Sequence, residues 1–234
     1  MDFDFTPYFE KYEKLVAQAD QVFERIKKEY PACVNCKKGC TDCCYALFDL
    51  TLIEALYLNQ KFKAAFGADA EMMEKANKAD RAIFRIKKRA YKEVQENNKD
   101  EVAVLYEMGR ERIRCPLLNE REMCALYAFR PITCRLYGIP TAIQGLGHSC
   151  GKSGFSEGES YPMVNMDKIF QQLQAISAEI VADIKTPYTK MDDMLVPVSM
   201  ALLTDYDDVF FGFAKDEGTD EGTDEGTDDQ KGRS

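Results

Sequence analysis

The sequence predicts a mainly α-helical protein: a single helical domain with a small irregular or β-hairpin cysteine-rich region, followed by a disordered acidic C-terminal tail. Three observations lead to this fold class. Apolar residues recur at steps of three and four over several long segments, which is the period of a helix with one buried face. Segments with the alternating pattern of strands are few. The nine cysteines of the 234-residue chain all fall between Cys33 and Cys150.

Capping signals set the ends of the expected helices. Thr6 acts as an N-cap with Pro7 at the first helical position, and this helix stops before Pro31. Thr51 and Glu54 make a capping box that starts the next helix, which ends at the following glycine. Three more helices are expected, over residues 69–98, 101–112 and 166–184.

The expected β content is small. The best candidate is a hairpin of residues 115–118 and 123–127, joined by the polar turn 119–122. Residues 141–160 hold five glycines and are expected to form an irregular loop. A helical cysteine-cluster domain is therefore expected over residues 1–205, with its cysteine core at 33–150.

The end of the chain, residues 206–234, has a different composition. Asp-Glu-Gly-Thr occurs three times from Asp216, and residues 214–234 hold eight carboxylates against three basic side chains. Such a segment cannot bury enough apolar surface to offset its ordering entropy, so disorder is expected. The net charge of −9 argues against nucleic acid as a partner. Without a signal-peptide or membrane-span pattern, a cytoplasmic protein with no membrane partner is expected.

The cysteines carry the strongest functional signal. Five of them lie within twelve residues, and a second, looser group follows. Thiolates at such spacing converge readily on one ion or cluster. A chain of this length can build a core without disulfide staples, and a reducing cytoplasm favours metal ligation over disulfides or free thiols. The candidate metal ligands are all nine cysteines: Cys33, Cys36, Cys40, Cys43, Cys44, Cys115, Cys124, Cys134 and Cys150.

The number and kind of metal centres stay open at this level. Neighbouring residues such as Cys43 and Cys44 rarely bind one tetrahedral ion, because their side chains leave the backbone in different directions. The thiols can form two four-cysteine sites, or one site with a cysteine-lined surrounding. Four thiolates suit both zinc and a cubane iron–sulfur cluster. An inventory with a single histidine favours the iron–sulfur cluster, with zinc as the alternative.

Weaker signals lie near the cysteines. His148 is either a ligand or proton donor, or a solvated loop residue. Arg130 and Arg135 flank Cys134, where they either hydrogen-bond sulfur or exposed carbonyls, or form ordinary ion pairs. The three-then-two spacing within the first cysteine group also occurs in radical S-adenosylmethionine enzymes. The chain lacks the alternating strands and helices of their β/α barrels, which argues against that class.

Four motifs surround the cysteines: Cys36-x-x-x-Cys40-x-x-Cys43-Cys44, Cys115-Pro-Leu-Leu, Cys124-Ala-Leu-Tyr and Arg130-Pro-Ile-Thr-Cys134-Arg. Together they resemble the bacterial CxxCxxCC cysteine-cluster family, which commonly has two residues where this chain has three between its first two matched cysteines. Members are described as zinc- or iron-chelating, some as iron–sulfur oxidoreductases, and the pattern also occurs in flagellin lysine N-methylases. The resemblance covers residues 33–150. It implies as ligands Cys40, Cys43, Cys44, Cys115, Cys124 and Cys134, followed by Cys36 and Cys150 and last by Cys33.

Three functions are compatible with this pattern. The leading one is an iron–sulfur protein with a redox or electron-transfer role, whose substrate and protein partner are unspecified. The first alternative is a zinc- or iron-chelating module or metal carrier without catalysis. The second is a protein-modifying enzyme related to the lysine methylases. The expected partner is the metal ion or cluster itself, and the sequence identifies no catalytic residue.

Overall fold

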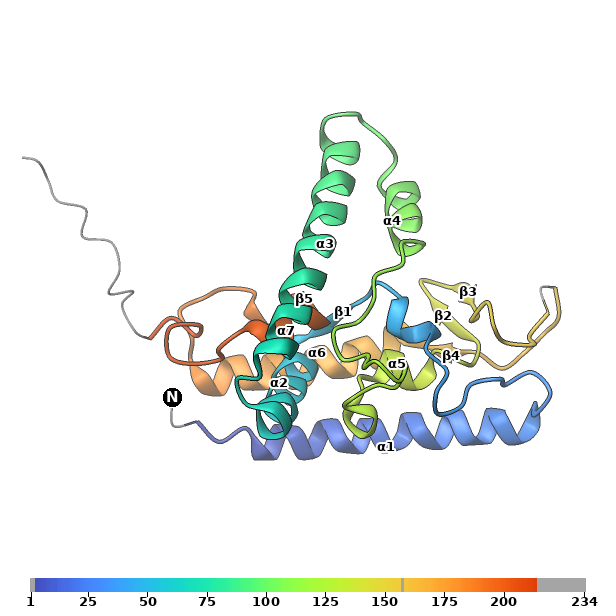
Figure 1. Cartoon of the computed structure of the whole chain (residues 1–234), viewed down its shortest axis with the longest axis horizontal. Helices are drawn as coiled ribbons and strands as arrows, with labels where there is room; N and C mark the ends of the chain where they lie inside the picture. The colour runs from blue at the N-terminus through green and yellow to red at the C-terminus, as the bar shows by residue number, and fades with distance from the viewer. Residues whose placement is uncertain (1–2, 157, 214–234) are drawn as a thin grey trace, which may run out of the picture.

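The computed structural model describes residues 3–156 and 158–213. It confirms the mainly α-helical fold, with seven α-helices and a few short strands in these residues. Two long helices, α1 (Thr6–Glu29) and α6 (Met166–Ile184), pack against each other along the lower part of the molecule (Figure 1). α2 (Leu52–Phe66) and the short α5 (Ile132–Leu136) pack onto this pair.

An apolar core fills the space between these four helices. Tyr12 and Ile26 of α1, Ile53 of α2, Leu136 of α5 and Ile180 of α6 are each at most 2% exposed. Burial of one such side chain stabilises a fold by roughly 1.5–3 kcal/mol relative to leaving it in water. The core therefore fixes the helices that carry or flank the cysteines.

The N-terminus of α2 connects distant parts of the chain. The predicted capping box is present, with Thr51 and Glu54 accepting hydrogen bonds from each other's backbone N–H groups. Glu54 is 4% exposed and also accepts a hydrogen bond from the backbone N–H of Ile132 at 3.2 Å. This bond fastens the start of α5 to α2. The helix ends as predicted at Gly67, where φ is +57°.

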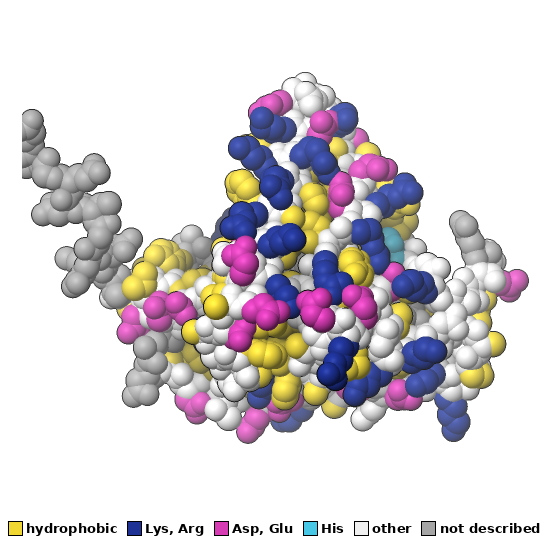
Figure 2. All heavy atoms as spheres, in the orientation of Figure 1, with side chains coloured by type: hydrophobic (Ala, Val, Ile, Leu, Met, Phe, Trp, Pro, Cys, Tyr) yellow, Lys and Arg dark blue, Asp and Glu magenta, His cyan; other side chains and the backbone are white. Residues whose placement is uncertain are grey.

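A helical hairpin of α3 (Ala70–Gln95) and α4 (Glu101–Gly109) projects from the body of the molecule (Figure 1). Each of its helices ends three residues before its predicted end. Lys and Arg side chains cover much of its visible face (Figure 2). α7 (Val198–Leu203) packs against the base of α3, where the Ser199 hydroxyl donates a hydrogen bond to Asp80 at 3.1 Å. The base of the hairpin is thus held firmly against the body.

Five short strands form two small sheets in the described residues. β1 (Asp49–Thr51) pairs antiparallel with β5 (Leu195–Pro197). β2 (Thr141–Ile143) pairs antiparallel with β3 (Leu146–His148) and parallel with β4 (Val164–Asn165). The first sheet ties the segment after the first cysteine group to the segment that leads into α7.

The hairpins differ in position from those predicted. Residues 141–148 form a β-hairpin, where an irregular loop was expected. Gln144 and Gly145 have positive φ angles of 50° and 77°, which suit a tight two-residue turn. The hairpin expected around the second cysteine group is reduced to one bridge between Leu118 and Cys124. Pro116, which follows Cys115, has no backbone N–H, so it cannot donate a hydrogen bond to a neighbouring strand.

The two ends of the described chain also correct the sequence-based picture. Thr6 lies inside α1, and the Asp4 side chain accepts the Thr6 N–H at 2.9 Å in place of the expected threonine cap. Of the segment expected to be disordered, Tyr206 and Phe210 pack against the core and Phe211 is completely buried in it. The rest of the expected disordered tail, 214–234, lies outside the described residues. Within the described part, no helix combines the length and apolarity that spanning a membrane requires.

Candidate metal centre

The first cysteine group lies on the segment between α1 and α2. After α1 the chain runs through a loop into a 3₁₀ turn, Asp42–Tyr45, which carries Cys43 and Cys44. A backbone hydrogen bond joins the second group to this turn, because the N–H of Cys115 donates to the carbonyl of Cys44 at 2.7 Å. Residues 71 positions apart in the sequence therefore meet at the turn.

Cys124 and Cys134 reach the same region by different routes. The N–H of Ala125 donates to the carbonyl of Leu117 at 2.7 Å, which folds the segment that contains Cys124 back on itself. Cys134 lies in α5, whose N-terminus is held by the buried Glu54 carboxylate. Backbone bonds and a buried cap, which do not depend on metal, thus place both side chains.

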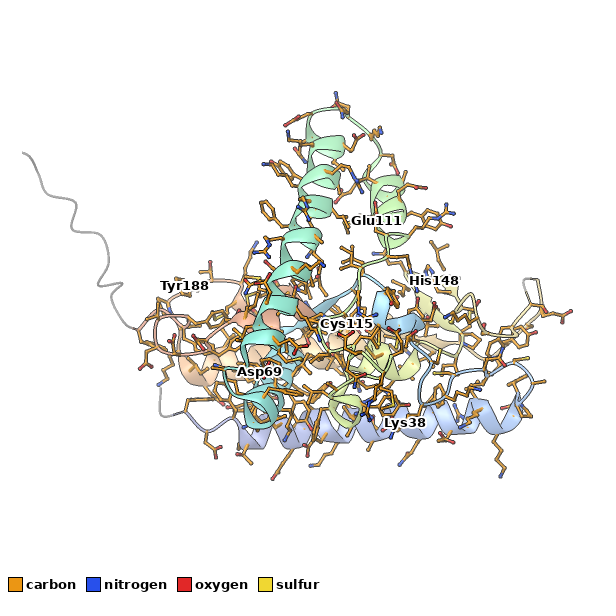
Figure 3. All side chains as sticks on the ribbon, viewed as in Figure 1. Lys38, Asp69, Glu111, Cys115, His148 and Tyr188 are labelled. Carbon is orange, nitrogen blue, oxygen red and sulfur yellow. The ribbon has the colours of Figure 1, made fainter. Side chains whose placement is uncertain are left out.

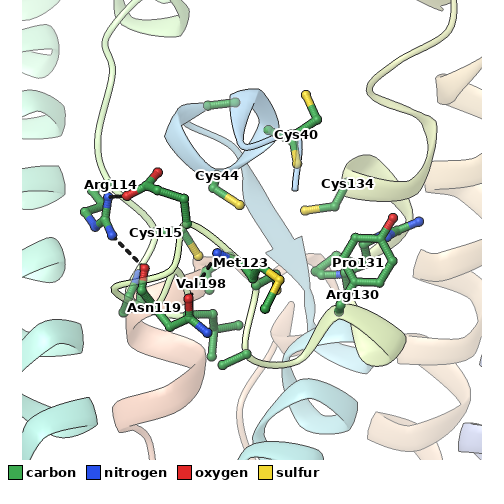
Figure 4. Close-up of a pocket in the computed structure, with 18 of the residues that line it drawn as sticks. Cys40, Cys44, Arg114, Cys115, Asn119, Met123, Arg130, Pro131, Cys134 and Val198 are labelled. Carbon is green, nitrogen blue, oxygen red and sulfur yellow. Dashed lines mark hydrogen bonds and ion pairs between the residues drawn. The ribbon is translucent and has the colours of Figure 1, made fainter. Parts of the chain in front are cut away.

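Seven cysteines line one cavity of about 380 Å³ at the base of the α3–α4 hairpin. They are Cys36, Cys40, Cys43, Cys44, Cys115, Cys124 and Cys134. Figure 4 shows Cys44, Cys115 and Cys134 directed toward a common space. Apolar side chains, including Ile83 of α3 and Val198 of α7, form part of the remaining wall.

A second, smaller cavity of about 20 Å³ adjoins the first, and four cysteines line it: Cys36, Cys40, Cys43 and Cys150. Cys33 lines neither of these two cavities. All nine thiols are free of disulfide bonds. The structure therefore gathers eight of the nine predicted ligands around two adjoining spaces and leaves Cys33 outside. Their action as ligands stays a prediction.

Burial and mutual contacts set the protonation of these thiols. Burial raises the pKa of Cys36 and Cys124, and raises the pKa of Cys115 to about 12. Cys43 behaves oppositely, because hydrogen bonds with the thiols of Cys134 and Cys44 lower its pKa. Cys43 is thus the member of the array that most readily becomes a thiolate. Thiolates are the form in which cysteine binds metals.

The two arginines that flank Cys134 have different roles. The Arg130 guanidinium lies over the Tyr127 ring, 3.8 Å from its centroid, and lines the larger cavity. Its positive charge lowers the pKa of Cys36, Cys43 and Cys124, although burial outweighs this effect at Cys36 and Cys124.

Arg135 is 8% exposed and lines neither of the two cavities. It donates hydrogen bonds to the carbonyls of Ala128 and Arg130 and to the carboxylate of Asp20. Two of the interactions expected for Arg135 are therefore present, namely hydrogen bonds to backbone carbonyls and an ion pair. It holds the loop that presents Arg130 to the cavity.

His148 lies apart from both cavities. It is exposed on β3, whereas Cys115 lies near the middle of the molecule (Figure 3). Neither cavity has His148 in its wall. The exposure of His148 is that of a solvated loop residue. The possible metal ligands in the walls of the two cavities are therefore cysteine sulfurs.

The donor chemistry fits a metal that prefers sulfur. Of the described residues that line the larger cavity, Glu122 is the one carboxylate, and Arg114 pairs with it at 2.6 Å. Among the described residues, no three side chains of the ligating types stand close enough together to hold an ion as they are. A thiol turns about one bond between staggered positions, so sulfurs that line a cavity can converge while the backbone stays in place. Zinc and iron–sulfur clusters both accept four such thiolates.

These features define the class of protein as a cysteine-rich metal-binding protein. A family model described as CxxCxxCC, a putative zinc- or iron-chelating domain, matches residues 35–151, which is half of the chain. The chain belongs to this family, as its motifs indicated. No curated protein matches the chain, and no solved structure does. Family membership supports metal binding by the cysteine array, and the family description names zinc and iron equally.

Proposed function

We propose that this protein is an iron–sulfur protein with a redox or electron-transfer role, and that its cluster binds in the larger cavity. The four thiols assigned to the cluster are Cys44, Cys115, Cys124 and Cys134. The main support for this proposal is the size and lining of the cavity, which has a volume of about 380 Å³ and seven cysteines in its wall. This volume lies within the roughly 300–1,000 Å³ typical of cofactor and ligand sites, and far exceeds what one ion needs.

The charges around the cavity support the binding of a four-thiolate centre there, and they suit a zinc site and a cubane cluster equally. A four-thiolate centre carries negative charge, which is costly to bury unless it is offset. Lys37, Lys38 and Arg130 line the cavity, and the only carboxylate among its described lining residues is already paired with an arginine. These three cations offset the charge of the thiolates. The chain as a whole is acidic, so their placement here is local.

The walls favour a centre that is shielded from water on one side. Phe48, Ile83 and Val198 form an apolar wall, while the cysteine-bearing turn forms another. A bound cluster would supply one-electron transfer, and its potential depends on solvent exposure and on hydrogen bonds to sulfur. In this chain the thiols bind, the cations balance charge, and the apolar wall lowers the local dielectric.

Anaerobic purification followed by iron, acid-labile sulfide and zinc analysis tests the proposal. We expect brown protein that contains iron and sulfide, with visible absorption that bleaches on reduction. Cys115→Ser is expected to lose both iron and sulfide, whereas Cys33→Ser, the matched control outside both cavities, retains them. Colourless protein with zinc and without sulfide would contradict an iron–sulfur centre. It would support the alternative of a zinc-chelating module or metal carrier.

The relation to lysine methylases remains a separate hypothesis. It requires S-adenosylmethionine to bind, which isothermal titration with the purified metal-loaded protein measures directly. We expect no binding of S-adenosylmethionine at micromolar concentrations. The likeness to the methylases rests on the cysteine motifs alone, and the described residues contain no glycine-rich turn between a strand and a helix of the kind that binds nucleotides.

A further inference from the structure

One exposed side of α3 carries a row of cations. They recur at steps of three and four residues, so they lie along the same side of the helix. We call this row the basic stripe, and its members, all exposed, are Lys78, Arg81, Arg85, Lys88 and Lys92. At 1.5 Å per residue the stripe is about 21 Å long. The one carboxylate in the sequence between its ends is Asp80, which already accepts a hydrogen bond from Ser199.

Most of the charge on the basic stripe has no counterion in the described part of the chain. Arg81 pairs with Glu74 at 3.1 Å, and the other four members form no ion pair with any described residue. Two aromatic rings of α3, Phe84 and Tyr91, are 62% and 66% exposed, so no described element covers this region. Figure 2 shows Lys and Arg side chains gathered over the same hairpin. Like charges three or four residues apart destabilise a helix, so an anionic occupant would stabilise α3.

The chain contains an anionic segment of matching charge. Residues 216–229, which we call the acidic segment, hold eight carboxylates and neither lysine nor arginine. The carboxylates come as four adjacent pairs separated by Gly-Thr. Eight negative charges are enough to pair with all five cations of the basic stripe.

The chain leads from the base of α3 toward the acidic segment. α7 packs against that base, where Ser199 contacts Asp80. The described chain ends at Phe213, ten residues after the end of α7 at Leu203. The 21 residues from 214 to 234 can span up to roughly 70 Å, which is more than three times the length of the stripe. Tethering on this scale gives effective concentrations on the order of mM, so individually weak ion pairs suffice.

We infer that the basic stripe of α3 is a docking surface for the acidic segment of the same chain. The contact consists of ion pairs between carboxylates and exposed cations, each of which contributes little alone and is screened by salt. When docked, the acidic segment occupies the stripe and competes with any other anionic surface for the α3–α4 hairpin. The inference does not depend on which metal the cysteines bind.

Carbodiimide coupling of the full-length protein tests the inference, because this reagent joins a carboxylate directly to a lysine amine that it contacts. Trypsin cleaves after Lys215 and Lys231, so the acidic segment is recovered in one peptide, and mass spectrometry identifies the lysines coupled to it. We expect coupling to Lys78, Lys88 and Lys92 in about 0.01 M salt. Coupling should fall at least about fivefold in about 1 M salt, where the Debye length decreases from roughly 30 Å to roughly 3 Å.

Lys190 serves as the reference amine. It is exposed and lies two residues after Tyr188, whose ring a Cβ at Gly212 would meet at 3.0 Å, close to the last described residue. Coupling that depended only on closeness to the start of the tail would favour Lys190. The inference instead predicts that the lysines of the basic stripe couple severalfold more than Lys190 in low salt.

A double variant tests the role of the stripe's charge. Arg81→Gln combined with Arg85→Gln removes two cations and leaves the three lysines as reporters, since arginine does not react in this coupling. Coupling at Lys88 and Lys92 should fall by about threefold or more. Arg25→Gln, a change at an exposed arginine of α1, is the matched control and should leave the coupling unchanged. Far-UV circular dichroism confirms that the helices form in both variants.

Equal coupling of the stripe lysines and Lys190 would overturn the inference, and so would coupling that high salt does not reduce. An equal mixture of isotope-labelled and unlabelled protein distinguishes docking within one chain from docking between chains. Docking within one chain gives coupled peptides in which both halves are labelled or both are unlabelled. Coupled peptides with one labelled half would assign the stripe to a second copy of the chain and overturn the inference.

Discussion

Replacing Arg135 with alanine should destabilise the fold and disturb the metal site without removing any ligand. The side chain is 8% exposed and donates to the carbonyls of Ala128 and Arg130, at 2.9 Å for the latter, and to Asp20 at 2.6 Å. Asp20 is 45% exposed, so solvent screens this ion pair and its contribution is small. Most of the loss in stability should come from the two lost hydrogen bonds to the backbone carbonyls of Ala128 and Arg130.

The magnitude follows from those two bonds. A hydrogen bond that involves a charged group contributes about 1.5–3 kcal/mol, so two of them at the lower value give a loss of about 3 kcal/mol. In a chain of this size, that loss lowers Tm by about 6–12 °C. Arg135→Lys keeps the charge and can reach Asp20, but a single ammonium cannot serve both carbonyls with the same geometry. It should recover less than half of the loss.

Urea unfolding followed by circular dichroism measures both variants, with metal-free protein used throughout so that ligand binding does not contribute. The matched control is Arg110→Ala, since Arg110 is 68% exposed and its ion pair with Glu107 is 3.7 Å long. The control should change the free energy of unfolding by less than about 0.5 kcal/mol. If Arg135→Ala were as mild as the control, the structural role assigned to this side chain would be wrong.

Three further predictions concern packing and pH. Gly138→Ala should destabilise the fold by about 1–3 kcal/mol in urea unfolding, because its Cβ would collide with Cys36, whereas Gly151→Ala meets no atom within 4 Å and should change the free energy of unfolding little. Phe211→Ala should cost about 3–5 kcal/mol in the same unfolding assay, because the ring is fully buried, and a loss below 1 kcal/mol would contradict its place in the core. Burial raises the pKa of Glu54, so its contribution to stability is greatest below its ordinary pKa and decreases as pH rises through the raised value. The free energy of unfolding of Glu54→Gln should therefore improve relative to wild type between pH 4 and pH 7, and a difference independent of pH would refute this.

Local signals in the sequence predicted both ends of α2 correctly. The Thr51–Glu54 capping box and Gly67 mark both ends of α2 in the structure as they do in the sequence. Such signals depend only on neighbouring residues, so they can be read without knowing the fold. The Glu54 carboxylate also accepts a bond from Ile132, 78 positions away, and no local pattern reveals a partner at that distance.

The strands were harder to predict because their pairing is non-local and their turn signals were weak. The turn at Gln144 and Gly145 lacks the asparagine or aspartate that usually marks a tight hairpin, and the strands on either side are only three residues long. The gathering of the cysteines was expected from their motifs. Their division between two cavities depends on how Cys150 docks near Asn35, a contact between segments more than a hundred residues apart.

The backbone bond between Cys115 and Cys44 has a consequence for how the protein is made. Ribosomes add about 5–20 residues per second, so Cys44, the last cysteine of the first group, leaves the ribosome roughly 4–14 s before Cys115 does. During that interval a nascent chain offers up to five cysteines with no second group to complete their site. Metal supplied too early would meet a partial set of thiols, so correct loading favours delivery after translation has passed Cys150.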